Sequence, residues 1–346
     1  MSCTTYLSRL GLLLTVSLWG CASIPEPPHP PGEPGPMSFQ LLRLQEMPAD
    51  LTPPRPAAPR LRWTPTLPGE GTIAAFTIEP EPRGLPVFEV RARSGNSAIQ
   101  LAPLPGGAYL GLISAPLNRQ SVEVKVSATL MDGTRLSQDM TLLISRRDFP
   151  ATQLRVARRF TEPDPESLKR IQRERDWQRA VLRTISDTPL WHGTFALPVE
   201  GVTTSPYGQR RLFNNELRSR HYGLDIDGQT GDPVRAANSG RVVLSADLYF
   251  NGNAVFIDHG LGFFTGYFHL SERHVFEGEW VERGTIIGEV GATGRVTGPH
   301  LHWSLYLRGI PLDPLSLLDP AFAALSERLP APALSPGRVS GSAPGQ

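Results

Sequence analysis

Cysteine is almost absent from this chain of 346 residues, and both cysteines lie close to the N-terminus. No cysteine follows Cys21. The part of the chain beyond Cys21 therefore holds neither a disulfide nor a free thiol, and its folding does not depend on the redox compartment.

An excess of charge of one sign is absent as well, since 34 Lys and Arg side chains stand against 33 Asp and Glu. Nucleic-acid-binding domains favour a basic face, so this balance argues against a nucleic-acid partner. The sequence also lacks Gly-x-Ser-x-Gly and His-Glu-x-x-His patterns. These absences argue against a nucleophilic serine of that type and against a zinc site on a helix.

No apolar run at the N-terminus is long enough to span a bilayer as a helix. The run Leu10–Leu18 falls short of the roughly 20 apolar residues that such a helix needs. Arg9 precedes it, and together they predict an export signal over residues 1–20. Leu18-Trp19-Gly20-Cys21 resembles a bacterial lipobox, which implies lipidation of Cys21; an ordinary secretory signal is the alternative.

A lipidated Cys21 implies a location for the protein. In lipoproteins of Gram-negative bacteria, a residue other than Asp after the cysteine usually permits sorting to the outer membrane, and here that residue is Ala22. Several acyl chains anchor a protein stably, whereas one binds only marginally. We therefore expect a protein of the cell envelope. Its lipid anchor would hold it on the periplasmic face of the outer membrane.

Proline, in contrast, is abundant, with 35 residues. Residues 21–60 comprise the lipidated cysteine and a proline-rich segment that can neither pair as a strand nor continue as a helix, which predicts an extended tether. Residues 326–346 are rich in Pro, Gly, Ser and Ala and are expected to be a disordered tail. The remaining stretch is long enough for two domains.

Residues 61–160 have the pattern of an all-β region. Apolar residues alternate in Val122–Val126 and around Met140–Leu142, and Asp132-Gly133 between them predicts a hairpin. Further strands are expected at Ile73–Ile78, Val87–Val90 and Tyr109–Ile113. We predict a β-sandwich-like accessory domain, in which no catalytic constellation is visible.

Residues 161–194 are predicted to contain a connecting helix over residues 164–186. Asp164 and Pro165 suit the N-cap and the first helical position. Trp177, Val181 and Ile185 recur every four residues and predict one apolar stripe. We expect the helix to pack against one domain; a gate or partner-binding element beside an active site is the alternative.

Residues 195–325 return to short strands separated by glycine turns, which predicts an antiparallel, β-rich catalytic domain and a mainly β fold overall. The expected strands are Arg241–Ser245, Ala254–Asp258, Phe263–Phe268, Thr285–Val290 and Leu301–Leu307.

This region gathers four imidazoles and one carboxylate, at His221, Asp225, His269, His300 and His302. Catalytic zinc usually takes three protein ligands and leaves a fourth position for water, so the set suffices for such a site with histidines left over for proton transfer. On a strand, His300 and His302 project to the same side. One of them can bind metal while the other faces the same cavity without binding.

His221 and Asp225 are four residues apart, which places them on one face of a strand or of a helix. Gly223 lies between them on the same strand face, where the missing side chain is expected to leave room for an ion. The glycine also argues weakly against a helix.

The stretch 195–318 resembles one known family. The matching motifs are Tyr207-Gly208-Gln-Arg210-Arg211, His221-Tyr-Gly-Leu-Asp225, Gly231-Asp-Pro-Val-Arg-Ala236, Asn251-Gly-Asn253, Ile257-Asp-His-Gly260, Tyr267-Phe-His269-Leu, Thr293-Gly294-Arg and Gly298-Pro-His-Leu-His302. They resemble the M23 (lysostaphin/LytM-type) zinc metallopeptidases, which cut peptide cross-links in peptidoglycan.

The resemblance implies a role for each of these side chains. His221, Asp225 and His302 would hold one Zn²⁺ per chain, and His269 and His300 would be unliganded catalytic histidines. The implied substrate is the stem peptide of peptidoglycan, with the bond from D-Ala to meso-diaminopimelate as the expected target of a zinc endopeptidase in cell-wall remodelling.

Two other functions are alternatives for this chain. Some lipoproteins with this fold lack zinc ligands and activate a cell-wall amidase, whereas this chain retains all three ligand positions. A sugar- or wall-binding module would leave the histidines without a purpose.

Arg210, Arg211 and Arg220 could meet substrate carboxylates or form a solvated basic loop. An unrestrained wall hydrolase would endanger its host cell. We therefore also consider a regulatory protein partner, which the sequence does not identify.

Overall fold

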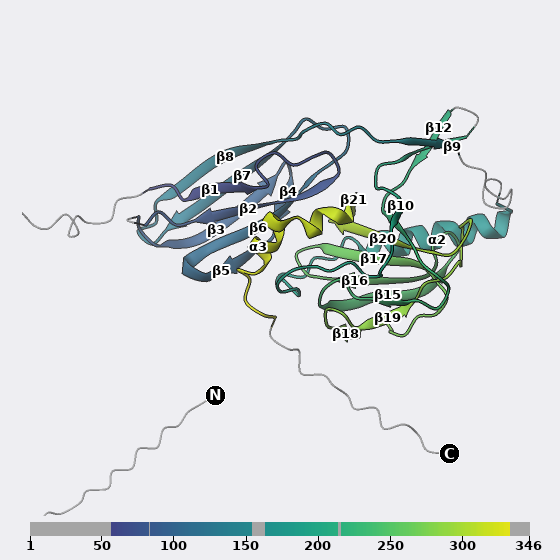
Figure 1. Cartoon of the computed structure of the whole chain (residues 1–346). Coiled ribbons are helices and arrows are strands. Elements are labelled where there is room, and N and C mark those ends of the chain that lie inside the picture. The colour runs from purple at the N-terminus through teal and green to yellow at the C-terminus, as the bar shows by residue number, and fades with distance from the viewer. Residues whose placement is uncertain (1–56, 83, 154–162, 214–215, 333–346) are drawn as a thin grey trace, which may run out of the picture. The chain divides into compact units, whose positions relative to one another are not determined.

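The structure is a computed structural model that describes residues 57–82, 84–153, 163–213 and 216–332 (Figure 1). The predicted signal over residues 1–20, the lipidated Cys21 and nearly all of the predicted tether lie outside the described residues. Within the described ranges, no helix combines the length and apolar character that crossing a membrane requires.

Two four-stranded antiparallel sheets form the β-sandwich that the alternating patterns predict (Figure 1). Their orders are β1-β2-β6-β5 and β4-β3-β7-β8. The strands are β1 (Arg60–Thr64), β2 (Thr72–Glu79), β3 (Val87–Ser94), β4 (Ser97–Ile99), β5 (Leu101–Leu104), β6 (Ala108–Ala115), β7 (Ser121–Leu130) and β8 (Arg135–Leu143). The predicted hairpin joins β7 to β8, and Gly133 in its turn has a φ of 84°, which favours glycine.

The first sheet buries both of its faces. Phe76 and Ile78 of β2 pack inside the sandwich, whereas Ile73 and Ala75 belong to a second hydrophobic cluster. Successive side chains of a strand point to opposite faces, so the two clusters lie on opposite sides of this sheet. The second cluster also contains Trp303 of the C-terminal region. The sandwich and the C-terminal region therefore share one hydrophobic core.

The predicted helix is α2 (Pro165–Val181), and it begins where the sequence indicates. Asp164 caps it by accepting hydrogen bonds from two backbone N–H groups of the first turn. The predicted apolar stripe is wrong, because Trp177 is 40% exposed and Ile185 lies beyond the end of the helix and is 43% exposed. Ile171 is the buried residue of α2 instead.

Polar contacts explain why α2 needs no continuous apolar stripe. The Glu174 carboxylate accepts a hydrogen bond of 2.8 Å from the Tyr249 backbone N–H. Arg170 pairs with Asp247 at 3.0 Å. These contacts tie the helix to the end of β15 (Gly240–Leu248).

The C-terminal region is an antiparallel β-sheet region, as predicted, with eight strands in one sheet. The order is β10-β13-β20-β17-β16-β15-β18, and β21 pairs with β20. Besides β15, the strands are β10 (Thr203–Ser205), β13 (Leu224–Asp227), β16 (Gly252–Asp258), β17 (Phe263–Leu270), β18 (Trp280–Val281), β20 (His300–Leu307) and β21 (Ile310–Leu312). Two further strands, β14 (Pro233–Arg235) and β19 (Ile286–Glu289), pair with each other.

A three-stranded sheet completes this region, with the order β12-β11-β9. β11 (Arg210–Phe213) and β12 (Glu216–Arg220) form an antiparallel pair just before His221. β9 (Ala151–Gln153) pairs with β11 in parallel, so the segment before α2 also supports this hairpin.

The described chain stays packed beyond the point where the tail was expected to begin. The helix α3 (Pro320–Ser326) follows the short 3-10 helix η3 (Pro314–Leu318). Leu329 is only 2% exposed and belongs to the shared core. Its carbonyl oxygen lies 2.9 Å from Nδ1 of His192. The expected tail therefore does not start at residue 326, and residues 333–346 lie outside the described part.

Candidate metal centre

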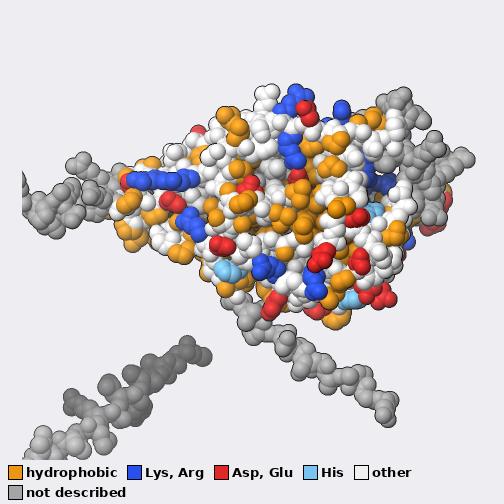
Figure 2. Space-filling view, viewed as in Figure 1, with side chains coloured by type: hydrophobic (Ala, Val, Ile, Leu, Met, Phe, Trp, Pro, Cys, Tyr) orange, Lys and Arg blue, Asp and Glu red, His pale blue; other side chains and the backbone are white. Residues whose placement is uncertain are grey.

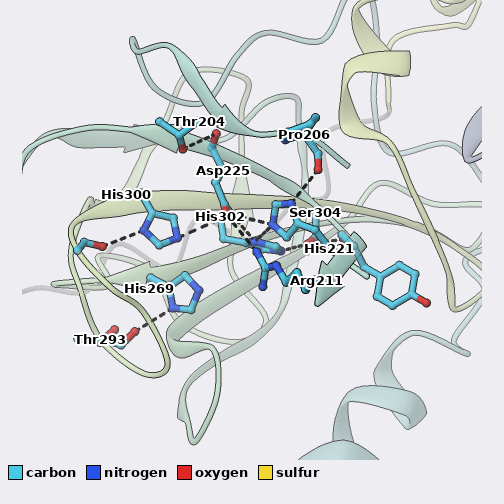
Figure 3. Close-up of polar contacts among 12 residues, drawn as sticks. Thr204, Pro206, Arg211, His221, Asp225, His269, Thr293, His300, His302 and Ser304 are labelled. Carbon is cyan, nitrogen blue, oxygen red and sulfur yellow. Dashed lines mark hydrogen bonds and ion pairs between the residues drawn. The ribbon is translucent and has the colours of Figure 1, made fainter. Parts of the chain in front are cut away.

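His221, Asp225 and His302 bring three ligand atoms together (Figure 3). Nε2 of His221 lies 2.9 Å from Oδ1 of Asp225 and 2.9 Å from Nδ1 of His302. The last two atoms are 2.7 Å apart. Ligand atoms about 2.0–2.1 Å from one zinc ion form a triangle only slightly larger than this. The three side chains thus have the chemistry and the spacing of a zinc site.

The position of His221 follows from the end of β12. The histidine is 1% exposed, and its Nδ1–H donates a hydrogen bond of 3.0 Å to the Pro206 carbonyl. A carbonyl only accepts, so the proton of the neutral ring lies on Nδ1 and the lone pair on Nε2. That lone pair faces Asp225 and His302, which is the usual way in which a neighbouring group orients a metal-binding histidine.

Asp225 and His302 face each other because β13 and β20 are paired. They are direct partners in the antiparallel register of these strands. The Ser304 hydroxyl donates to the Tyr222 carbonyl at 3.3 Å, so the Nε2–H of His302 donates to Oγ of Ser304 at 2.9 Å and the lone pair of the neutral ring lies on Nδ1. Neither Ser304 nor the Pro206 carbonyl belongs to the set that the sequence motifs predict. Ser304 could have been found, since a residue two positions after His302 shares its strand face.

Gly223 makes room for the ring of His302. A Cβ atom at this position would lie 2.4 Å from Nε2 of His302 and 2.7 Å from the Trp303 carbonyl oxygen. His221 and Asp225 also do not share one strand, because β12 ends at Arg220 and β13 begins at Leu224. The turn between these strands brings the two side chains together.

The charge balance of the site favours a cation. Burial by itself raises the pKa of Asp225, but the neighbouring His221 and His302 outweigh burial and hold the pKa of this carboxyl below its ordinary value. Burial lowers the pKa of His302 to about 4, although Asp225 opposes the shift. Nε2 of His221, Nδ1 of His302 and one carboxylate oxygen of Asp225 therefore converge, a donor set that suits a zinc ion.

His300 and His269 lie beside this triangle without belonging to it (Figure 3). Nε2 of His300 is 3.7 Å from Oδ1 of Asp225, and the rings of His300 and His269 have centroids 5.1 Å apart. The Nδ1–H of His300 donates to the Gly298 carbonyl at 2.9 Å, and that of His269 donates to the Thr293 carbonyl at 2.8 Å. In the neutral form of either ring, the lone pair therefore lies on Nε2.

The backbone of His269 has an uncommon conformation. Its φ is 64°, in the left-handed region that residues other than glycine rarely adopt, and its N–H donates to the Asn251 carbonyl at 2.8 Å. Burial and the neighbouring His302 and His300 lower the pKa of His269 to about 3, so the ring is neutral at physiological pH. Such local strain is typical of functional positions.

A second group with metal-ligand chemistry occurs among the described residues, at Glu272, His274 and Glu289. Nε2 of His274 lies 3.7 Å from Glu272 and 3.5 Å from Glu289. The side chain of Glu272 is 72% exposed, whereas that of Asp225 is 10% exposed. The buried group is the stronger candidate, because buried carboxylates and imidazoles need a compensating charge.

Residues 219–314 match the model of peptidase family M23. The chain carries an M23 peptidase domain. Over 125 residues it is 42% identical to peptidoglycan DD-endopeptidase ShyC of Vibrio cholerae, a match that covers 36% of this chain and 29% of that protein. It is 40% identical over 117 residues to DD-carboxypeptidase/endopeptidase Mpg of Neisseria meningitidis, covering 34% of this chain and 27% of the relative.

The matched part of the chain thus spans less than a third of the length of these curated relatives. A crystal structure described as an M23 peptidase from Pseudomonas aeruginosa covers more of the chain. It is 29% identical with a TM-score of 0.54, and the match covers 72% of this chain and 95% of that one. The structural likeness therefore extends well beyond the M23 domain. Family M23 consists of zinc metallopeptidases, in agreement with the metal predicted from the sequence.

Proposed function

We propose that this protein is a zinc-dependent endopeptidase that hydrolyses peptide cross-links of bacterial peptidoglycan. The observation that carries the proposal is the triangle of His221, Asp225 and His302 beside the rings of His269 and His300, in an M23 domain. Similarity to proteins named peptidoglycan DD-endopeptidases supports the substrate class. The bond between D-Ala and meso-diaminopimelate is the specific target in this proposal.

His221, Asp225 and His302 would hold the zinc ion, and a bound zinc ion supplies a Lewis acid for the scissile carbonyl and the attacking water. His300 and His269 act through their Nε2 lone pairs. Either ring can accept a proton from the attacking water or, once protonated, stabilise the negative charge that develops on the carbonyl oxygen. The backbone carbonyls of Gly298 and Thr293 hold both rings in the required tautomer.

The proposed place of action is the periplasm. Lipidation at Cys21, anchoring at the outer membrane and a tether over residues 21–60 would let the enzyme reach the wall from the membrane. The domain boundaries at residues 61–160, 161–194 and 195–325 belong to the same proposal, with the sandwich as an accessory domain and the peptidase domain as the catalytic unit.

The test measures zinc and hydrolysis on the same preparation of the full chain, purified without chelators. We expect close to one zinc per chain by mass spectrometry of the metal. Incubation with cross-linked peptidoglycan should convert dimeric muropeptides to monomers, and a chelator should stop the conversion. Bound zinc with no change in any muropeptide would rule out the endopeptidase. Neither zinc nor cleavage, even after zinc is added back, would favour the amidase-activating lipoprotein.

Three variants separate the roles of the histidines. His302→Ala should lose both zinc and hydrolysis, because it removes a ligand. His300→Ala should keep zinc and lose about a hundredfold or more in rate, the usual loss when a general acid–base group is removed. His274→Ala, in the exposed second group, is the matched control and should change neither quantity. Wild-type rates in His300→Ala would contradict its catalytic role.

A further inference from the structure

Arg211 reaches the candidate metal centre from β11 (Figure 3). Its Nη2 atom lies 3.5 Å from Oδ2 of Asp225, while Oδ1 is the oxygen that faces His221 and His302. The guanidinium therefore stands on the outer side of the carboxylate. A substrate group that contacts the Arg211 guanidinium would therefore lie close to the position that a metal ion would occupy.

The guanidinium of Arg211 has donors to spare. Nε is buried and has no hydrogen-bond partner among the described residues, and the contact to Asp225 is long for a hydrogen bond. A buried, unpaired donor of a charged group is costly, and a planar guanidinium binds a carboxylate through two parallel hydrogen bonds. An anion that enters the site would satisfy these donors.

A second arginine adds to the positive charge. Arg295 follows the Thr293-Gly294 turn, and its guanidinium carbon lies 4.4 Å from the centre of the Phe250 ring. Burial lowers the pKa of Arg295, and the charge of Arg211 lowers it further, so the two guanidiniums act on each other. A divalent cation held by His221, Asp225 and His302 would share the Asp225 carboxylate with the Arg211 guanidinium, and such a site would favour an anionic ligand.

We propose that Arg211 binds a substrate carboxylate on the carbon attached to the scissile nitrogen, and thereby selects amide bonds that carry this group. The inference rests on the proposed peptidoglycan hydrolysis. In a cross-link from D-Ala to meso-diaminopimelate, the residue that provides the nitrogen has a free carboxylate on that same carbon. A C-terminal D-Ala–D-Ala bond has the same feature. This carboxylate lies close enough to the scissile bond to meet a guanidinium beside the metal ligands.

Arg210 provides a matched control on the same strand. Neighbouring residues of a strand point to opposite faces, and Arg210 pairs in register with Arg220, away from Asp225. Both line a separate cavity of about 510 Å³ together with Phe149. Substitution of Arg210 removes the same charge from the same hairpin without touching the contact to Asp225.

The experiment compares two substrates with the zinc-loaded full chain. One is a purified muropeptide dimer with the free carboxylate beside the scissile nitrogen, and the other is the same dimer with that carboxylate converted to a carboxamide. The wild type should prefer the free carboxylate by about tenfold to a hundredfold in kcat/KM, the range expected for a charge-assisted pair. Arg211→Gln should bring this ratio close to one, by slowing cleavage of the carboxylate substrate only.

Two further variants sharpen the result. Arg210→Gln should keep the wild-type ratio. Arg211→Lys, which keeps the charge but not the planar fork, should retain part of the preference. Zinc content is measured for every variant and should stay constant.

Several outcomes would overturn the inference. An equal loss on both substrates in Arg211→Gln would mean that Arg211 only supports Asp225 or the fold. The same fall of the ratio in Arg210→Gln would assign the preference to overall charge. If the wild type cleaves neither dimer, the proposed function itself fails, and the inference with it. That failure is visible before any variant is made.

Discussion

His259 is a fully buried histidine that takes no part in the metal centre. Its Nδ1–H donates to the Ser239 carbonyl at 2.7 Å, and its Nε2 lies 2.8 Å from the Thr265 hydroxyl oxygen. The Tyr267 hydroxyl continues this network by contacting Thr265 and accepting from the Ala237 N–H. A protonated ring would leave a charge in the core, where burial penalises it. Burial accordingly lowers the pKa of His259 to about 4.

This shift predicts a loss of stability in acid. The unfolded chain takes up the proton near pH 6.5, whereas the folded chain resists it until about pH 4. The contribution of His259 is therefore complete above pH 6.5, and about 3 kcal/mol is lost as the pH falls toward 4. Urea unfolding at several pH values measures this contribution to the free energy of unfolding, when the zinc-free wild type is compared with the zinc-free His259→Gln variant. An equal loss in both proteins would contradict the prediction.

At the scale of the element, α2 depends on one buried side chain and several polar contacts. Ile171 is 8% exposed, while Trp177 on the same helix is 40% exposed. The helix also forms part of a hollow with Phe250 and Asn251, near the loop that supports His269. Its attachment to the sheet is therefore local, and a larger hydrophobic residue does not imply a larger contribution to stability.

The pair Ile171 and Trp177 gives a direct test. Ile171→Ala should lower the free energy of unfolding by about 2–4 kcal/mol, because it removes buried methyl groups and leaves a cavity. Trp177→Ala should cost less than about 1 kcal/mol, as is usual for exposed positions. Urea unfolding at constant pH compares the two variants with the wild type. A larger loss of unfolding free energy in Trp177→Ala than in Ile171→Ala would contradict this prediction and would favour the apolar stripe that the four-residue spacing predicts.

At the scale of the whole described molecule, the sandwich and the M23 domain share a hydrophobic cluster. Leu110 and Leu112 of β6 belong to the same cluster as Leu305 and Leu317 from the M23 side. Polar contacts reinforce it: Arg147 pairs with Asp313 at 2.9 Å, in a region where Asp313 is nearly buried. Surfaces joined by a continuous apolar core unfold together, because separating them exposes that core to water.

Leu112→Ala tests this coupling, since Leu112 is fully buried on the shared face. We expect a loss of about 2–5 kcal/mol and a single calorimetric transition that moves to lower temperature as a whole. Backbone amides of β7 and of β16 should lose their protection from hydrogen exchange at the same free energy. Two separate transitions, with only the C-terminal one sensitive to zinc, would show that the two parts unfold independently.

The sequence by itself predicted the features that depend on local pattern. Alternating apolar residues located the strands, and Asp164 with Pro165 located the start of α2, because strand faces and helix caps are set by neighbours along the chain. The motifs around His221 and His302 resembled those of family M23, which the matched family model bears out for residues 219–314.

The tertiary structure decided what depends on distant partners. The pairing of β13 with β20 places His302 opposite Asp225, and the close approach of that ring accounts for Gly223. Arg210 and Arg211 look alike in the sequence, yet only Arg211 faces Asp225. Which side of a strand meets a given surface is set by register between strands far apart in the chain, and a local pattern carries no information about that register.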